Sequence, residues 1–573
     1  MLQNDISTKA ENKSSCDNVF STSKGGICVG RIIGNRRITL MLLALMLVLG
    51  TILAGCSSSG SGNQEFRFTL ASEPPSLDPA LMTDAQSSIV ASGLFEGLMR
   101  LNSAGEPQKA IAKDYKVSDD GKTYTIELRD DAKWSNGDPV TAHDFVYSWQ
   151  RALAPATAAD YAYMLYYLEN AQQYNAGEIT DPNEIGVKAL GDYTLEAKLY
   201  TAAPYFVSLL AHYTYFPVHK ETVEAKPDWA AEAETMVTNG PFLLEEWAHE
   251  DKLVLKKNPD YFDEDKVSFE TVTITLVNDA NTVLNLFDTD AIDWIGAQAG
   301  SVPTDPTPKL VAEGKAEIKT IASVYYYLFN TTKAPFDNAK VRKAFAMAID
   351  RQIIIDNVTQ ANQTPAFGLV PPSIAGMDGK SYREIYPDNF FEENIEEAKK
   401  LLAEGLKESG ISAIPAETTL LYNTDEGHKK IAEAIADMWR TNLGVEVKLA
   451  NQEWGTFLES RKGGQFDVAR SGWGADFNHA INFTYDLIHP ASGNNDGKYN
   501  NPKVGQLLDE SLLATDEKDR LDKIAEAERL AFEEDMGALP IYYYTTVVMV
   551  KDGFKDVVSD YAGHLDWAFG SKE

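Results

Sequence analysis

The stretch at residues 418–476 reads TTLLYNTDEGHKKIAEAIADMWRTNLGVEVKLANQEWGTFLESRKGGQFDVARSGWGAD, and its pattern decides the class of fold. Thr418 to Tyr422 and Val445 to Leu449 each predict a strand. Between them, Glu426 to Asn442 predicts an amphipathic helix that Gly444 ends. A strand, a helix and a second strand in this order form a βαβ unit, which indicates an α/β protein with parallel strands.

The end of this stretch predicts a ligand site. Phe466 to Arg470 has the pattern of a further strand, and residues 471–476 are expected to form a loop at its carboxyl end. In open α/β sheets, ligands bind at that edge. Gly472 and Gly474 in the loop would let another backbone approach closely. We therefore expect a binding site around residues 470–476.

Patterns elsewhere predict more interleaved strands and helices. Residues 123–128 alternate like a half-buried strand. Helices are expected over 141–153 and 394–410, because each range opens on a capping residue followed three positions later by an acid, Asp144 or Glu397.

Length and charge limit the kind of protein. A chain of 573 residues is too long for one hydrophobic core, so several domains are expected. Asp and Glu number 85 against 52 Lys and Arg, which gives a formal charge of −33. This charge would repel phosphate backbones, so nucleic acid is excluded as a partner.

The first 63 residues have the features of an export signal and a lipid anchor. Basic residues at 31, 36 and 37 precede an apolar run from Ile38 to Leu53, which is shorter than the roughly 20 residues of a membrane span. Leu53-Ala54-Gly55-Cys56 then resembles a bacterial lipobox, which implies that Cys56 is lipidated. We predict a leader and signal peptide over 1–55, and a lipidated cysteine with a flexible tether over 56–63.

Cysteine usage and catalytic motifs argue against metal and enzyme chemistry. Cys16 and Cys28 would leave with the leader, and Cys56 would carry lipid, so neither a disulfide nor a thiolate metal site is expected. The sequence has no G-x-S-x-G, H-E-x-x-H, P-loop or G-x-G-x-x-G motif. We expect a protein that is not an enzyme and has no cofactor, and a surface peptidase stays open only through an unrecognised carboxylate pair.

A series of motifs carries a resemblance over essentially the whole mature chain. In order, they are SLDP at 76–79, LFEGL at 94–98, AKWSNGDPVTAHDF at 132–145, NGPF at 239–242, VRKA at 341–344, YNT at 422–424, HKK at 428–430, NQEW at 451–454 and PIYYY at 540–544. In these motifs the chain resembles the oligopeptide-binding proteins of ABC transporters, within the peptide- and nickel-binding solute-binding protein family 5.

The resemblance implies an architecture. It is the α/β, bilobal, periplasmic-binding-protein-like fold of type II, in which three domains close on the ligand like a hinged trap. Domain I would combine residues 64–95, 221–322 and 544–573. Domain II would be the insertion 96–220, and domain III would be 323–543.

The resemblance also implies residue roles. Asp476 would pair with the peptide amino terminus, although a loop Asp can equally serve a local turn. The other roles fall into three groups: Arg461, Arg470 and His428 as cations for the peptide carboxylate; Thr83, Asp84, Ala85, Gly472, Trp473 and Gly474 along the peptide backbone; and Tyr161, Tyr326, Trp454, Trp473 and Phe477 around its side chains. Aromatic residues are more often core than ligand contacts.

The partners implied are short peptides and the permease subunits of an ABC importer, with the protein acting as a monomer on the outer face of the cell membrane. Two alternatives stay open. The solute could be a dipeptide, a nickel chelate or haem, or the protein could sense peptides at the surface without transport.

Overall fold

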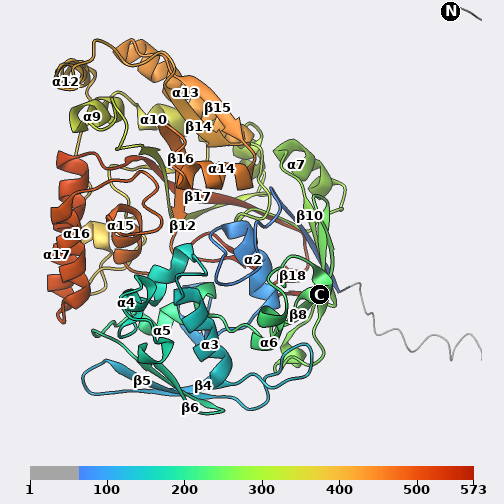
Figure 1. The fold of residues 1–573 in the computed structure, drawn as a ribbon. Coiled ribbons are helices and arrows are strands. Elements are labelled where there is room, and N and C mark those ends of the chain that lie inside the picture. The colour runs from blue at the N-terminus through green and yellow to red at the C-terminus, as the bar shows by residue number, and fades with distance from the viewer. Residues whose placement is uncertain (1–63) are drawn as a thin grey trace, which may run out of the picture. The chain divides into compact units, whose positions relative to one another are not determined.

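Three sheets organise the part of the chain that the structure describes, which is residues 64–573 of a computed structural model (Figure 1). The predicted signal peptide, Cys56 and the tether lie outside these residues. The largest sheet has the strand order β11-β17-β12-β16-β14-β15, and β13 pairs with β17. Its strands are β11 (Trp294–Ile295), β12 (Glu317–Phe329), β13 (Thr364–Pro365), β14 (Thr419–Asn423), β15 (Lys448–Gln452), β16 (Val468–Gly474) and β17 (Leu539–Val550).

The other two sheets have four strands each. One has the order β1-β10-β9-β8, with β1 parallel to β10, and the other is the antiparallel sheet β4-β5-β7-β6. Their strands are β1 (Glu65–Leu70), β4 (Ala112–Val117), β5 (Thr123–Leu128), β6 (Val187–Gly191), β7 (Thr194–Lys198), β8 (Phe242–Ala248), β9 (Lys252–Lys257) and β10 (Thr271–Leu276). Short pairs complete the set: β2 (Met99–Leu101) with β3 (Pro107–Lys109), β18 (Phe554–Lys555) with β21 (Ser571–Lys572), and β19 (Val558–Ser559) with β20 (Leu565–Asp566).

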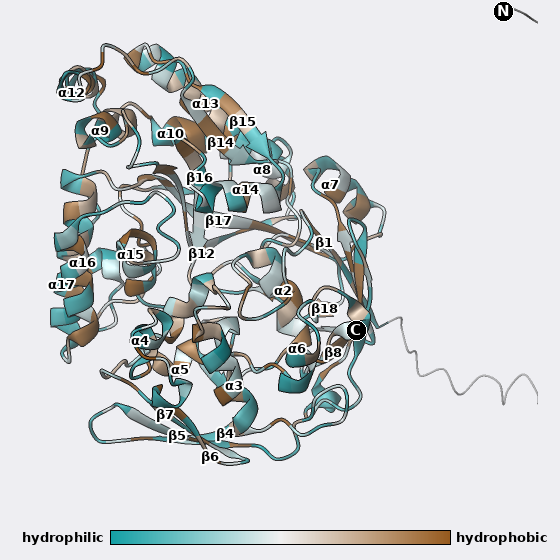
Figure 2. Cartoon of the chain, in the orientation of Figure 1, coloured by the Kyte–Doolittle hydropathy of each residue, from teal (hydrophilic) through white to brown (hydrophobic). Residues whose placement is uncertain are grey.

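Helices lie between the strands and on the sheet faces (Figure 1). Their bounds are α2 (Ala85–Leu94), α3 (Ala142–Leu153), α4 (Ala171–Asn175), α5 (Phe206–Leu209), α6 (Lys220–Ala225), α7 (Ala280–Asp288), α8 (Thr307–Ala312), α9 (Ala339–Met347), α10 (Arg351–Ile354), α11 (Tyr382–Ile385), α12 (Ile395–Glu408), α13 (Glu426–Leu443), α14 (Trp454–Lys462), α15 (Ile481–Ile488), α16 (Pro502–Leu513) and α17 (Glu517–Arg529). Figure 2 shows hydrophilic and hydrophobic residues alternating along α16 and α17, as expected for helices that bury one face.

The predicted βαβ unit is confirmed as β14, α13 and β15, with β14 and β15 parallel. Asp425 caps α13, because its side chain accepts a hydrogen bond from the backbone N–H of His428 at 2.8 Å. Gly444 ends the helix in the left-handed conformation, with a φ of 70°. The strand predicted over 445–449 is displaced, since β15 begins at Lys448.

One local prediction is wrong in a way that affects the site. Residues 471–474 are not a loop, because β16 continues through Gly474. The continuation is held by antiparallel pairing with β12, in which Ser323 faces Gly474 and Tyr325 faces Gly472. The residues expected to meet a ligand therefore lie on a rigid strand.

The hydrophobic core divides into two large parts. One contains apolar residues from within 66–95, 218–299 and 548–568, and the other joins residues from within 98–215 with residues of 322–543. The long strand β17 contributes buried residues to both parts, and β12 pairs beside it with register shifts between Thr320 and Val324 and between Tyr325 and Tyr326. The three-domain division remains a prediction. The first core supports it, because segments assigned to domain I supply that core.

Candidate functional site

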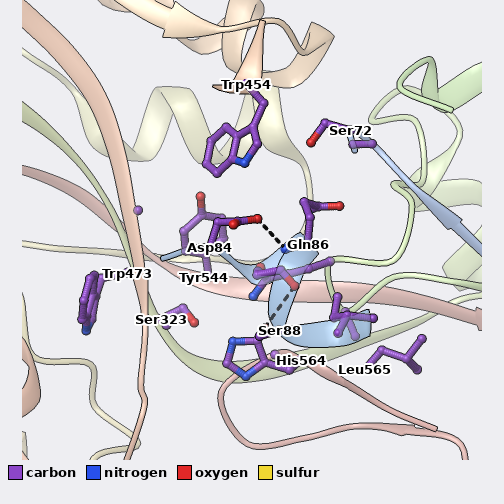
Figure 3. A pocket seen from close by; sticks show the side chains of 18 of the residues that line it. Ser72, Asp84, Gln86, Ser88, Ser323, Trp454, Trp473, Tyr544, His564 and Leu565 are labelled. Carbon is purple, nitrogen blue, oxygen red and sulfur yellow. Dashed lines mark hydrogen bonds between the residues drawn. The ribbon is translucent and has the colours of Figure 1, made fainter. Parts of the chain in front are cut away.

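A cavity of about 920 Å³ lies between segments that are far apart in the sequence. Its walls include the start of α2, the ends of β14 and β16, the middle of β17 and residues 560–566 (Figure 3). Of the predicted site residues in the described region, those that line it are Thr83, Asp84, Ala85, Tyr161, His428, Trp454, Arg461, Arg470, Gly472, Trp473, Gly474 and Asp476. The cavity thus occupies the strand edge where the sequence predicts a site.

Asp476 lies just beyond β16, and Asn482 and His212 lie beside its carboxylate. Asn482 donates from Nδ2 to Oδ2 of Asp476 at 2.9 Å and accepts the backbone N–H of Asp476 at 2.8 Å. Nε2 of His212 lies 3.4 Å from Oδ1. The side chain of Asp476 is only 12% exposed, and no lysine or arginine within residues 64–573 forms an ion pair with it. A negative charge therefore faces the cavity without a permanent cation.

Arg470 supplies the opposite charge from the same strand. Its Nη2 donates to the hydroxyl of Tyr544 at 2.7 Å, its Nη1 lies 3.4 Å from Oδ1 of Asn423, and its guanidinium lies 5.0 Å from the ring centre of Tyr325. Burial lowers the pKa of Arg470, but the nearby hydroxyls of Tyr544 and Tyr325 outweigh burial and raise it overall. In the described region no carboxylate pairs with this buried cation, so it is available to an anionic ligand group.

His428 does not fit the predicted role of a cation. Its pKa is lowered to about 3, first by burial and then by the charge of Arg470, with a smaller opposing effect of Asp425. The ring is therefore neutral near pH 7 and can act only as a hydrogen-bond donor or acceptor. Its Nδ1 lies 3.4 Å from the hydroxyl of Tyr325.

Arg461 lines the cavity, but its guanidinium already forms an ion pair with Asp496. Nε donates to Oδ2 of Asp496 at 2.7 Å, and Nη1 donates to Oγ of Ser471 at 3.2 Å. Of the three cations predicted from the sequence, Arg470 alone is charged and free of an ion pair within the described residues.

The backbone of β16 presents an open edge to the cavity. β14 pairs with β16 only at Val468 and Ala469, so on that side residues 470–474 have no strand partner in the described region. A Cβ atom on Gly472 would lie 3.1 Å from Nη2 of Arg470 and 3.2 Å from the hydroxyl of Tyr544. Glycine at this position therefore leaves the arginine and its tyrosine partner undisturbed.

At the facing wall, Asp84 caps α2. Its Oδ1 accepts the backbone N–H groups of Gln86 and Ser87 at 3.0 and 3.1 Å, and its Oδ2 accepts the hydroxyl of Ser87 at 2.7 Å. Burial raises the pKa of Asp84, and these hydrogen bonds oppose the rise. Figure 3 shows Trp454 and Gln86 beside it, at the cavity wall.

The predicted aromatic residues divide into two groups. Tyr161 and Trp473 line the cavity and stack on each other, with ring centres 6.1 Å apart. Tyr326 and Phe477 do not line it, because both are buried in the core, and Phe477 stacks on Tyr205 at 5.2 Å. Every residue of β12 from Ile321 to Phe329 is buried, so no alternation in the sequence marks which of them face the cavity.

Two residues beside Asp476 were not predicted from the sequence. His212 and Asn482 carry no motif, and His212 is separated from Asp476 by more than 260 positions. Only the tertiary fold brings them together.

The described residues show neither a metal-binding cluster nor a membrane-crossing helix. Within residues 64–573, no group of three or more His, Cys, Asp or Glu side chains is placed to hold a metal ion. None of the helices from α2 to α17 has both the length and the apolar character needed to cross a membrane.

Comparison with known proteins identifies the family of this chain. The family described as bacterial extracellular solute-binding proteins, family 5 middle, matches residues 106–495. The oligopeptide-binding protein OppA of Bacillus subtilis is 38% identical over 538 residues, which cover 92% of this chain and 97% of that protein.

Solved structures agree with this assignment. Haemophilus influenzae OppA in complex with the peptide RPPGFSPFR is 35% identical, covers 89% of this chain and 99% of its own, and has a TM-score of 0.82. A structure of the murein tripeptide-binding protein MppA of Escherichia coli is 33% identical and has a TM-score of 0.83. The match covers 89% of this chain and 99% of that one. The unliganded open form, which covers 98% of its own chain, gives 0.60. The chain belongs to the bacterial extracellular solute-binding proteins of family 5, with their α/β bilobal fold.

Proposed function

We propose that this protein captures short peptides outside the cytoplasm and delivers them to an ABC importer, without cleaving them. The observation that carries the proposal is that β16 and the residues just after it place a cation and an anion in the same cavity. Within the described residues, Asp476 forms no ion pair with a lysine or arginine, and Arg470 forms none with a carboxylate. A free peptide carries the two complementary charges at its ends.

The spacing of the two charges suits short peptides. Arg470 and Asp476 are six positions apart in the sequence, so their Cα atoms lie at most about 20 Å apart at the rise of an extended strand. The side chains of Arg470 and Asp476 can reach toward each other, which shortens the distance between their charges. An extended peptide of about three to five residues spans a similar distance. The open edge of β16 at residues 470–474 would add hydrogen bonds to the peptide backbone, which do not depend on its sequence.

The proposal rests on the pairing of Asp476 with the peptide ammonium, which a double-mutant cycle tests. Asp476→Ala should weaken binding of Ala-Ala-Ala by about 3 to 5 kcal/mol, as for removal of one partner of a buried pair. This loss corresponds to at least about a hundredfold in Kd. N-acetylation of the peptide should weaken binding to the unmodified protein by a similar amount, but weaken binding to the variant much less.

Calorimetry on the four combinations measures these losses, and mass spectrometry of the bound peptide should recover it uncleaved. Asp265→Ala removes an exposed carboxylate and serves as the matched control. If the effects of the variant and of acetylation simply add, Asp476 does not hold the amino terminus.

We also propose that Cys56 carries the lipid that anchors a monomeric protein to the outer face of the cell membrane. The support is the lipobox at residues 53–56, followed by a serine- and glycine-rich segment. Two acyl chains on one cysteine give stable membrane attachment. Cys56→Ser should move the protein from the membrane fraction to the soluble fraction or stall its processing. Unchanged fractionation and size would contradict the anchor.

A further inference from the structure

His212 is a buried imidazole in the cavity to which the sequence analysis assigned no role. It follows α5, its side chain is 5% exposed, and it lines the cavity beside Asp476. Nδ1 accepts the backbone N–H of Thr214 at 3.3 Å, so the proton of the neutral ring lies on Nε2. That Nε2 has no hydrogen bond of good geometry within the described region, and the nearest acceptor is Oδ1 of Asp476 at 3.4 Å.

The ring is fixed in place by aromatic neighbours. Tyr161 stacks on it with ring centres 5.3 Å apart, and the ring of Tyr213 lies at 4.0 Å. Burial raises the pKa values of both tyrosines, so both are neutral at physiological pH. His212 therefore cannot turn away from Asp476 without breaking two ring contacts and its bond to Thr214.

Three more titratable groups face this region. Asp486 lies behind Asn482, and burial, then the charge of Asp476, raise its pKa. Asp84 acts on Tyr213 from the start of α2. His564 lines the cavity from another segment, and Asp560 and Asp476 raise its pKa against burial. Of these groups, the carboxylate of Asp476 is the one in direct reach of His212.

We propose that His212 completes the subsite for the peptide amino terminus, and that a proton on its ring competes with the peptide ammonium for Asp476. The inference rests on the proposed function, because it takes the ammonium to sit at Asp476. The neutral ring places Nε2 3.4 Å from Oδ1 and leaves the negative charge for the peptide. The protonated ring pairs with Asp476 and places a second positive charge where the ammonium binds.

The sign of the pH effect follows from this competition. In the proposed competition, a proton on the His212 ring and the peptide ammonium cannot both pair with Asp476. The complex therefore binds fewer protons than the separate partners, so peptide binding releases protons and affinity falls as the pH is lowered. Histidine is the side chain whose charge normally changes between pH 5 and 8.

The test measures the Kd of Ala-Ala-Ala at pH 7.0, 6.0 and 5.0, where the peptide ammonium stays charged. The unmodified protein should lose about tenfold or more in affinity across this range, within the usual span of coupling between two sites. His212→Gln keeps a neutral donor, and His212→Phe keeps the ring contacts. Both should lose no more than about threefold, because neither can bind the competing proton.

His564→Gln is the matched control, since it removes the other cavity histidine that interacts with Asp476. It should keep most of the pH dependence of the unmodified protein, because the ion-pair partner of His564 is Asp560 and not Asp476. A steep pH dependence that survives in both His212 variants, or that disappears in His564→Gln instead, overturns the inference. In either case tight binding at pH 7.0 would still support peptide capture, whereas absence of binding at every pH contradicts the proposed function itself.

A measurement on the unmodified protein does not depend on how the variants fold. Calorimetry at pH 6.0 in two buffers of different ionisation enthalpy reports the protons exchanged on binding. Release of a measurable fraction of a proton supports the competition, and zero exchange or proton uptake contradicts it.

Discussion

At the scale of single residues, Arg470 and Arg461 show that two arginines in one cavity can have different roles. Arg461 is matched by Asp496, so its charge stabilises the empty protein. Arg470 meets only hydroxyl, amide and ring groups in the described region. An unmatched buried charge costs stability unless a ligand neutralises it. Loss of Arg461 should therefore lower stability more than peptide binding, and loss of Arg470 should lower peptide binding more than stability.

Arg470→Met should lower the affinity for a peptide with a free carboxylate by about a hundredfold, as for loss of a partner in a buried ion pair. It should leave the melting temperature of the empty protein unchanged or raise it, because no carboxylate loses its partner. A peptide with an amidated carboxyl end should bind the variant and the unmodified protein about equally. Calorimetry and thermal melts measure both effects.

Arg461→Met is the control for this prediction. It leaves Asp496 buried without its cation, so it should lower the melting temperature while changing peptide affinity less. If Arg470→Met lowers the melting temperature of the empty protein more than Arg461→Met does, Arg470 is a structural residue rather than a site for the peptide carboxylate.

The sequence could identify Asp476 and Arg470 because both lie in one recognisable stretch. It could not identify His212, Asn482 or Tyr544 as their partners, because those residues come from other segments. Nor could it give the charge state of His428, which depends on burial and on Arg470 after folding. The sequence gives the type of each side chain, but the charge state of that side chain depends on burial and on the charges that the fold places near it.

At the scale of elements, capping residues gave the helix starts correctly. α3 begins after Thr141, whose backbone N–H donates to Asp144 at 2.7 Å, and α12 begins after Asn394, which accepts the N–H of Glu397 at 3.1 Å. These signals involve side chains within three positions of each other, so a short window of sequence contains them. β5 likewise has the predicted bounds, 123–128.

Strand ends were predicted less well, for a physical reason. Val445 to Leu449 alternates like a strand, but the N–H of Val445 bonds to the carbonyl of Trp439 as part of the end of α13. Pairing with β14 begins only where Lys448 faces Thr419. β16 is longer than predicted because β12 pairs with it as far as Gly474. A strand ends where its partner ends, and that partner is remote in the sequence.

At the scale of the whole molecule, contacts at the cavity wall and beyond it also join the predicted domains II and III. We name this set the clasp: Asp160, Tyr163, Ala202 and Tyr205 on one side, and Lys462, Phe477, Asn494 and Arg520 on the other. Lys462 pairs with Asp160 at 2.8 Å, Asn494 donates to the hydroxyl of Tyr163 at 2.9 Å, Arg520 donates to the carbonyl of Ala202 at 3.3 Å, and Tyr205 stacks on Phe477. These contacts need no peptide atom, so they would stabilise a closed arrangement directly.

The comparison with MppA fits a closed arrangement. The present structure agrees better with one MppA structure, at a TM-score of 0.83, than with its unliganded open form, at 0.60. Since β17 contributes to both cores and β12 pairs beside it with a register shift near Ser323, we infer that these strands bend when the cavity opens.

The last prediction is that peptide closes the molecule and that the Tyr205–Phe477 contact of the clasp, of which neither ring lines the cavity, contributes to affinity. X-ray scattering should give a smaller radius of gyration with saturating Ala-Ala-Ala than without it. Tyr205→Ala removes the ring that Phe477 stacks on, so it should lower peptide affinity by about threefold to thirtyfold, because a smaller share of the protein reaches the closed state. Tyr115→Ala on β4, a half-buried tyrosine outside the clasp, should leave affinity unchanged.

A radius that does not change on binding would refute closure while leaving peptide binding intact. If the radius decreases on binding but Tyr205→Ala binds with unchanged affinity, only the role of the clasp is contradicted, because closure would then be driven by the peptide contacts alone.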